Sequence, residues 1–175
     1  MPAPESRLDP PYVADELTML RSYLDYHLAT FRWKTGGLTR AELGQSLPSS
    51  TLTLAGLVKP LALVEDWWFG ENLAGTPSMA PFTDVDFDVD PEWEFRTALD
   101  DTPEYLADLH ERAIAAADRN ITAAGDVEAL AVRLHPRTGD GISLRWILLH
   151  MIEEYARHNG HVDLIREAVD GTTGE

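Results

Sequence analysis

Residues 143–169 read SLRWILLHMIEEYARHNGHVDLIREAV, and this stretch decides the fold because it predicts one long amphipathic helix. Ser143 is of the residue type that caps a first helical turn, and Gly171 is of the type that follows a last one. Between these signals, apolar side chains such as Leu148 and Ile152 flank a set of imidazole and carboxylate side chains. The helix therefore has one side suited to packing against other helices.

Other stretches repeat this helical spacing of apolar residues. The predicted helices cover residues 12–34, 41–47, 53–69, 103–123 and 143–169, the second of them short. Four long helices predict an all-α fold, a four-helix bundle with long connections and a short extra helix. We expect a flexible N-terminus at residues 1–11, a single domain over residues 12–170 and a C-terminal tail at residues 171–175.

Two features interrupt the pattern. Pro60 falls inside the second long helix, where a proline removes a backbone donor and costs about 3 kcal/mol unless the helix starts or kinks there. Gly56, four residues earlier, is expected to ease such a kink. Residues 70–90 carry prolines and alternating aspartates, which predicts an exposed acidic loop.

Composition excludes several classes of protein. The chain has 175 residues, 44% of them hydrophobic and 25% charged, which is typical of a globular domain. With 30 acidic against 14 basic residues, the net charge of −16 would repel nucleic acid. The absence of cysteine means that any thiol chemistry needs a thiol from another molecule. No apolar run is long enough for a membrane span, so we expect a cytoplasmic protein without a membrane or nucleic-acid partner.

The last helix carries the residues that suggest chemistry. His150, Glu154, His158 and His161 fall within roughly an 80° arc of a helix that turns 100° per residue. A glutamate and a histidine four residues apart, here Glu154 and His158, are suited to hold one divalent metal ion. The alternatives are an ordinary surface pair or a buried histidine that is merely hydrogen-bonded.

Three segments resemble DinB-like proteins of actinobacterial type, a superfamily that includes mycothiol-dependent S-transferases and isomerases. The first is LDYH at residues 24–27 with WK at 33–34, and the second is LTLAGLVK at 52–59 followed by LALVEDWWF at 61–69. The third and most specific is ISLRWILLHMIEEYARHNGH at residues 142–161. Together these segments place the resemblance over about residues 12–170.

This resemblance implies a four-helix bundle, often a homodimer, with one divalent metal ion such as zinc or nickel. The ion is held by a histidine of the second helix and a His/Glu-x-x-x-His pair of the last. Carried over to this chain, the pair is Glu154 and His158, which we also expect to be the catalytic residues. The ligand of the second helix falls at position 60, where this chain has Pro60. Mycothiol is the co-substrate that the resemblance implies.

Because a catalytic zinc ion normally has three protein ligands, a substitute for position 60 is needed. His27 on the first helix is our leading substitute ligand, with His161 or His150 as alternatives. We assign Arg145 and His161 to substrate binding. Five tryptophans exceed what the core of such a bundle needs, which with the resemblance indicates a homodimer.

Three functions are consistent with these residues and with the resemblance. The first is a metal-dependent thiol (mycothiol) S-transferase or related DinB-like enzyme with an altered metal site, acting on a small-molecule thiol and an electrophile. The alternative, favoured by Pro60, is a metal-free small-molecule-binding or stress-associated bundle without catalysis. A third, minor possibility is a metal-free reaction in which Glu154 orients His158 as a general base.

Overall fold

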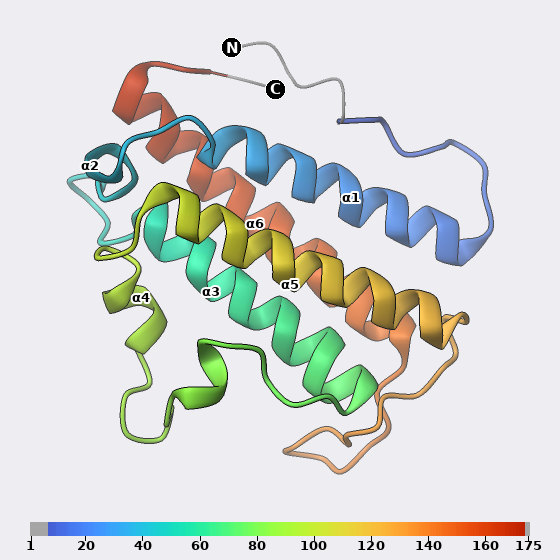
Figure 1. Cartoon of the computed structure of the whole chain (residues 1–175). Coiled ribbons are helices and arrows are strands. Elements are labelled where there is room, and N and C mark those ends of the chain that lie inside the picture. The colour runs from blue at the N-terminus through green and yellow to red at the C-terminus, as the bar shows by residue number, and fades with distance from the viewer. Residues whose placement is uncertain (1–6, 174–175) are drawn as a thin grey trace.

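The computed structural model describes residues 7–173, and Figure 1 shows helices joined by turns and loops. Its elements in chain order are α1 (Glu16–Thr35), α2 (Arg40–Leu43), α3 (Ala55–Glu65), the π-helix η1 (Asp66–Ala74), the 3-10 helix η2 (Phe82–Asp84), α4 (Trp93–Thr97), α5 (Pro103–Ala124) and α6 (Leu144–Asp170). No strand occurs among the described residues, where extended pairing is limited to two isolated bridges. The all-α class is confirmed, and the long helices fit the expected four-helix bundle.

The long helices pack in two contacting pairs around the core. Figure 1 shows α1 beside α6, and α1 and α6 contact each other, as do α3 and α5. Each helix contributes fully buried side chains to the space between them: Phe31, Leu57, Leu106, Leu148 and Tyr155. Removing one such apolar side chain from water contributes about 1.5–3 kcal/mol. This core holds α3 and α6 in fixed positions relative to each other.

The ends of several helices are set by local side chains, as the sequence predicts. Thr39 and Glu42, which lie three residues apart, form a capping box at the start of α2. The Ser143 hydroxyl accepts a hydrogen bond from the first turn of α6, and Gly171 ends that helix with a φ of 73°. A positive φ is a conformation that glycine adopts without strain.

Thr102 gives a direct test of these caps. Its Oγ1 accepts a hydrogen bond from the Tyr105 backbone N–H at 3.2 Å, at the start of α5. We expect Thr102→Ala to lower the free energy of unfolding by about 1 kcal/mol, because one donor of the first turn loses its partner. Urea denaturation measures the change. Thr102→Ser keeps the hydroxyl and should stay close to the parent; an equal loss in both variants would contradict a capping role.

The second long helix differs from its expected form. It was expected as one helix over residues 53–69, but α3 ends at Glu65 and the chain continues as a π-helix to Ala74. The wider turn alters the regular backbone pairing, and a side-chain amide meets one carbonyl: Asn120 Nδ2 donates to the Phe69 oxygen at 3.0 Å. The contact from Asn120, which belongs to α5, cannot be seen in the local sequence pattern.

Pro60 lies inside α3, and the helix continues on both sides of it.

Other boundaries also moved. α1 begins at Glu16 rather than near residue 12, because Asp15 caps its first turn. The acidic segment at residues 70–90 starts with the end of η1 and is otherwise a loop with the short η2, and α4 follows it without having been predicted. Of the expected flexible N-terminus, residues 1–6 lie outside the described part of the chain. α4 forms one wall of the cavity that Glu154 and His158 border.

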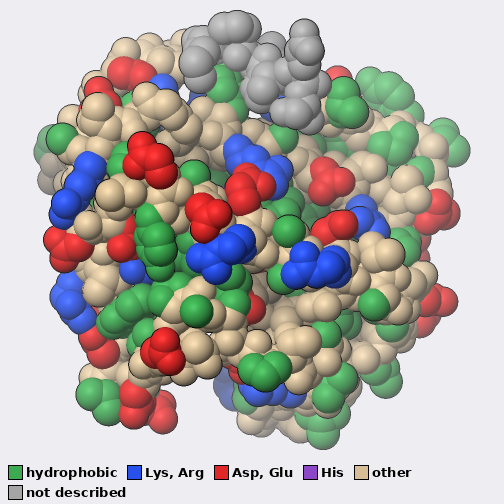
Figure 2. All heavy atoms as spheres, in the orientation of Figure 1, with side chains coloured by type: hydrophobic (Ala, Val, Ile, Leu, Met, Phe, Trp, Pro, Cys, Tyr) green, Lys and Arg blue, Asp and Glu red, His purple; other side chains and the backbone are tan. Residues whose placement is uncertain are grey.

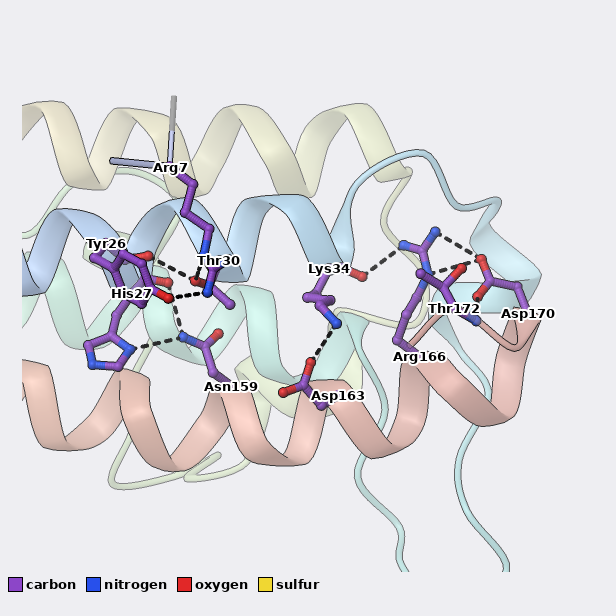
Figure 3. A network of polar contacts seen from close by, with 10 residues as sticks. All are labelled: Arg7, Tyr26, His27, Thr30, Lys34, Asn159, Asp163, Arg166, Asp170 and Thr172. Carbon is purple, nitrogen blue, oxygen red and sulfur yellow. Dashed lines mark hydrogen bonds and ion pairs between the residues drawn. The ribbon is translucent and has the colours of Figure 1, made fainter. Parts of the chain in front are cut away.

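Polar contacts join α1 to α6 and to the end of the chain (Figure 3). Lys34 is buried, and its Nζ lies 2.7 Å from Asp163 Oδ1. Arg166 donates to the Lys34 carbonyl at 2.8 Å and pairs with Asp170. Pairing the buried ammonium offsets much of its desolvation cost. These contacts fix the angular position of α6 against α1.

The surface carries mixed charges. Figure 2 shows acidic and basic side chains intermingled on one face of the molecule. Arg32 Nε of α1 lies 2.5 Å from Glu111 Oε1 of α5, and Arg112 pairs with Asp108 within α5. Exposed pairs of this kind contribute at most about 1 kcal/mol each. Among residues 7–173, no helix combines the length and apolar character needed to cross a membrane.

Candidate functional site

The polar side chains of the last helix lie along one face of α6, as their spacing predicts. Glu154 stands in the middle, with its Oε1 3.9 Å from His150 Nε2 and its Oε2 3.4 Å from His158 Nε2. One turn further, the Nδ1 atoms of His158 and His161 are 3.5 Å apart. The side chains of His150, Glu154 and His158 are 24%, 19% and 23% exposed, so this ridge is half-buried.

Glu154 and His158 border a cavity of about 160 Å³ between α6, α3 and α4. Pro60 lines the same cavity, so position 60 of α3 lies opposite the pair on α6. The wall from α3 is apolar and includes Leu57, Leu61 and Val64. The structure therefore brings together the two residues expected as ligands and the position where the third is missing.

Burial controls the protonation of His158. Partial removal from water lowers the pKa of its imidazole below the usual value, and the neighbouring Glu154 carboxylate opposes this shift without cancelling it. The imidazole is therefore neutral at pH 7. A neutral imidazole has a free lone pair, which is what metal binding or proton acceptance requires.

Glu94 on α4 is a residue of this site that the sequence did not reveal. It lines the same cavity as Glu154 and His158, it is buried, and its Oε2 has no hydrogen-bond partner. Burial raises the pKa of the Glu94 carboxyl above its usual value. The only available signal was the pattern Trp93-Glu94-Phe95 after the acidic loop, and a five-residue helix is too short to be recognised by periodicity.

Two residues at this cavity, Glu154 and His158, are spaced as two ligands of one divalent metal ion are. Bonds near 2 Å place two ligand atoms of one ion about 3–3.5 Å apart, and the 3.4 Å between Glu154 and His158 agrees with this. A second carboxylate, with an unpartnered oxygen, borders the same space. One imidazole and two carboxylates form a donor set that divalent transition metals accept.

His150 lies at the other end of the ridge in an aromatic environment. Its ring stacks on Trp146 at 5.0 Å and meets Trp68 edge-on at 5.1 Å. Among the described residues, His150, Glu153 and Glu154 form the group whose possible ligand atoms lie within 4.8 Å of one another. Glu153 is exposed and already pairs with Arg157. His150 is thus held beside Glu154 but outside the cavity lining.

The structure places His27 away from the cavity, on the seam between α1 and α6 (Figure 3). The amide of Asn159 donates to the His27 carbonyl at 3.0 Å and lies 3.4 Å from its Nδ1. Burial, with the nearby charge of Arg7, lowers the pKa of His27. Its role as a ligand stays a prediction, and these contacts favour a role in positioning α6.

Arg145 is engaged by acidic side chains. It makes two hydrogen bonds to the Glu16 carboxylate, at 2.6 and 2.9 Å, and its Nη1 lies 2.7 Å from Glu128 Oε1. These hydrogen bonds raise the pKa of its guanidinium further. An acidic substrate group would have to compete with both carboxylates, so substrate binding by Arg145 stays a prediction.

A second titratable cluster is enclosed in the core. Tyr155 Oη lies 2.8 Å from His110 Nε2, and the same hydroxyl donates to Glu65. Burial raises the pKa of Glu65 to about 8 and lowers that of His110 to about 3, so both groups are neutral at pH 7. Glu65 is 1% exposed, which removes it from direct contact with a substrate.

The fold and this cavity define a class of protein: an all-α bundle whose last helix presents a carboxylate and an imidazole to a partly open cavity. The family model described as mycothiol S-transferase matches residues 19–171. The chain therefore belongs to this family, a DinB-like family. The match includes α3, α4 and α6, which together line the cavity. No curated protein matches the chain.

Proposed function

We propose that this protein is a metal-dependent mycothiol S-transferase, which joins the sulfur of a small-molecule thiol to an electrophile. The family supports the thiol as substrate. The observation that carries the metal dependence is the Glu154–His158 pair at the cavity, with its ligand atoms 3.4 Å apart. The chain has no cysteine, so the reacting sulfur comes from the substrate.

In this proposal Glu154 and His158 would hold the ion at the cavity that they line. The chemistry that a bound divalent ion supplies is a lowered thiol pKa, which makes the thiolate available as nucleophile. Leu57, Leu61 and Val64 exclude water from one side of the reacting sulfur. His161 lies next to His158 at the end of the ridge, where we assign it to substrate contact. The cytoplasm, which keeps such thiols reduced, suits this reaction.

A transfer assay tests the proposal. Untagged protein, mycothiol and a fluorogenic haloalkyl electrophile are combined; the sulfur–carbon bond forms, the halide leaves and the thiol proton goes to water. We expect transfer faster than the uncatalysed reaction, loss of that acceleration on chelation and its return with zinc or nickel. No acceleration by metal-loaded protein would refute the proposal.

The metal-free binding protein remains a second candidate because of one observation. Pro60 contributes no donor atom at the position opposite Glu154 and His158. If this candidate is right, the protein binds no stoichiometric metal after purification and dialysis against zinc. Elemental analysis of untagged protein therefore separates the two candidates.

We also propose a homodimer. The five tryptophans indicated an aromatic surplus, and Trp146 is indeed 43% exposed, beside the 51% exposed Leu149 on α6. Aromatic side chains of this kind are enriched at interfaces. Light scattering should give the mass of a dimer, and Trp146→Ser should shift it toward the monomer. A monomer mass at every protein concentration would contradict the homodimer and would show that Trp146 and Leu149 stay exposed to solvent.

A further inference from the structure

We propose that Glu94 of α4 supplies the third protein ligand of the metal site, in place of the histidine that position 60 lacks. The inference rests on the proposed function, because it assumes that Glu154 and His158 bind a divalent ion. Glu94 lies on α4, whereas the missing ligand would lie on α3, and both positions line the same cavity.

The first observation is a shared cavity. Glu94, Pro60, Glu154 and His158 all line the same space of about 160 Å³. No other carboxylate or imidazole borders it among the described residues. Glu94 thus has direct access to the space that a ligand at position 60 would enter.

The second observation is the unpartnered oxygen. Glu94 is 7% exposed, yet its Oε2 makes no hydrogen bond. A buried carboxylate oxygen without a partner costs free energy that a cation offsets. The nearby ammonium of Lys59 is already engaged, at 2.6 Å from Asp101 Oδ2 and 2.8 Å from Thr97 Oγ1. Glu94 as a residue borders the cavity, which is the space from which a cation would reach its carboxylate.

The third observation is that α4 is anchored, so Glu94 is held at the cavity wall. Lys59 precedes Pro60 on α3, and its ammonium lies 4.2 Å from the centre of the Trp93 ring. The same ammonium donates to Thr97, at the other end of α4. Both ends of this short helix are therefore attached to α3 by one buried lysine.

The alternative ligands are less well placed. His150 packs between Trp146 and Trp68, and His27 packs on Asn159, and neither lines the cavity. The ligand atoms of Glu94, Glu154 and His158 are not all within 4.8 Å of one another. For the three to share one ion, the Glu94 side chain has to rotate toward Glu154 and His158.

This ligand set has a chemical consequence. Two carboxylates and one imidazole neutralise a divalent ion and form a harder site than one with two imidazoles. Carboxylate oxygens suit manganese better than imidazole nitrogens do. Replacing Pro60 with histidine would shift the preference toward zinc and nickel.

The test compares Glu94→Gln with Glu92→Gln, which removes an exposed carboxylate from the start of the same segment. Zinc and manganese are titrated calorimetrically into each apo protein, and thermal unfolding is followed with and without metal. We expect Glu94→Gln to weaken binding at least about 100-fold and to reduce the metal-induced rise in Tm. Without metal its Tm should not fall, because an unpaired buried carboxylate is replaced by a neutral amide. Glu92→Gln should match the parent.

A second variant protects the test against a folding defect. If Glu94→Gln folds normally and has lost only one metal-binding side chain, adding Pro60→His to the same chain should restore zinc affinity. Equal affinity in the parent and Glu94→Gln, with binding still lost in Glu154→Gln, would overturn the role of Glu94 and leave the proposed function standing. A parent that binds neither metal would overturn both.

Discussion

The His158→Ala variant is expected to lose zinc affinity by about 1,000-fold or more, because one lost ligand removes several kcal/mol of binding free energy. His158 contributes the imidazole that lies 3.4 Å from Glu154 at the cavity. Glu154→Gln should have a similar effect, since it removes the carboxylate of the same pair. Calorimetric titration of the apo proteins measures both losses. Thiol transfer should fall with metal occupancy.

His161→Ala is the matched control for this prediction. It removes a neighbouring imidazole of the same ridge, and His161 does not line the cavity. Metal affinity should stay within a few-fold of the parent, while any change in thiol KM would report the proposed substrate contact. If His158→Ala and His161→Ala both bind zinc as the parent does, the ion is held elsewhere or not at all.

Glu65→Gln is expected to make the protein more stable at pH 8 than the parent, with a much smaller gain at pH 5. The pKa of Glu65 is about 8 in the folded protein, against 4.5 for a glutamate exposed to water. The folded state therefore holds a proton that the unfolded state releases, so the parent loses stability as the pH rises from about 4.5 to 8. A difference of one pKa unit between the folded and unfolded states corresponds to about 1.4 kcal/mol of stability, so the full effect on the free energy of unfolding is several kcal/mol.

Urea denaturation at pH 5 and pH 8 measures this effect as a difference between variant and parent. Glutamine keeps the shape of Glu65 and accepts the Tyr155 hydrogen bond without titrating. Glu167→Gln, at an exposed position of α6, controls for the loss of one acidic side chain. Parallel stability curves for parent and Glu65→Gln would contradict a raised pKa at this position.

The helices themselves were well predicted because their signals are local. Thr39 with Glu42, Thr102 and Ser143 are capping residues whose partners lie three residues away, so the sequence contains the whole interaction. The π-helix after Glu65 was missed since one of its carbonyls is met by Asn120, far along the chain. The single domain over residues 12–170 stays a prediction.

The site was predicted in part. The spacing of His150, Glu154, His158 and His161 places them on one face of any helix, and the structure has them there. Whether that face meets solvent or a cavity depends on the elements that pack against it. The metal-ligand, catalytic and substrate roles assigned to these side chains, and to His27 and Arg145, stay predictions.

By itself the sequence determined the all-α class, the capped long helices, the one-sided ridge of α6 and the lack of a donor at position 60. These follow from spacing and residue type within a few turns of one helix. Only the tertiary structure decided that Pro60 faces Glu154 and His158, that His27 instead meets Asn159, and that Glu94 borders the cavity. The physical reason is that each placement depends on contacts between residues far apart in the chain. For Glu94, these are the contacts of the buried Lys59 of α3 with Trp93, Thr97 and Asp101, which lie 34 to 42 residues later in the sequence. No local pattern encodes such contacts.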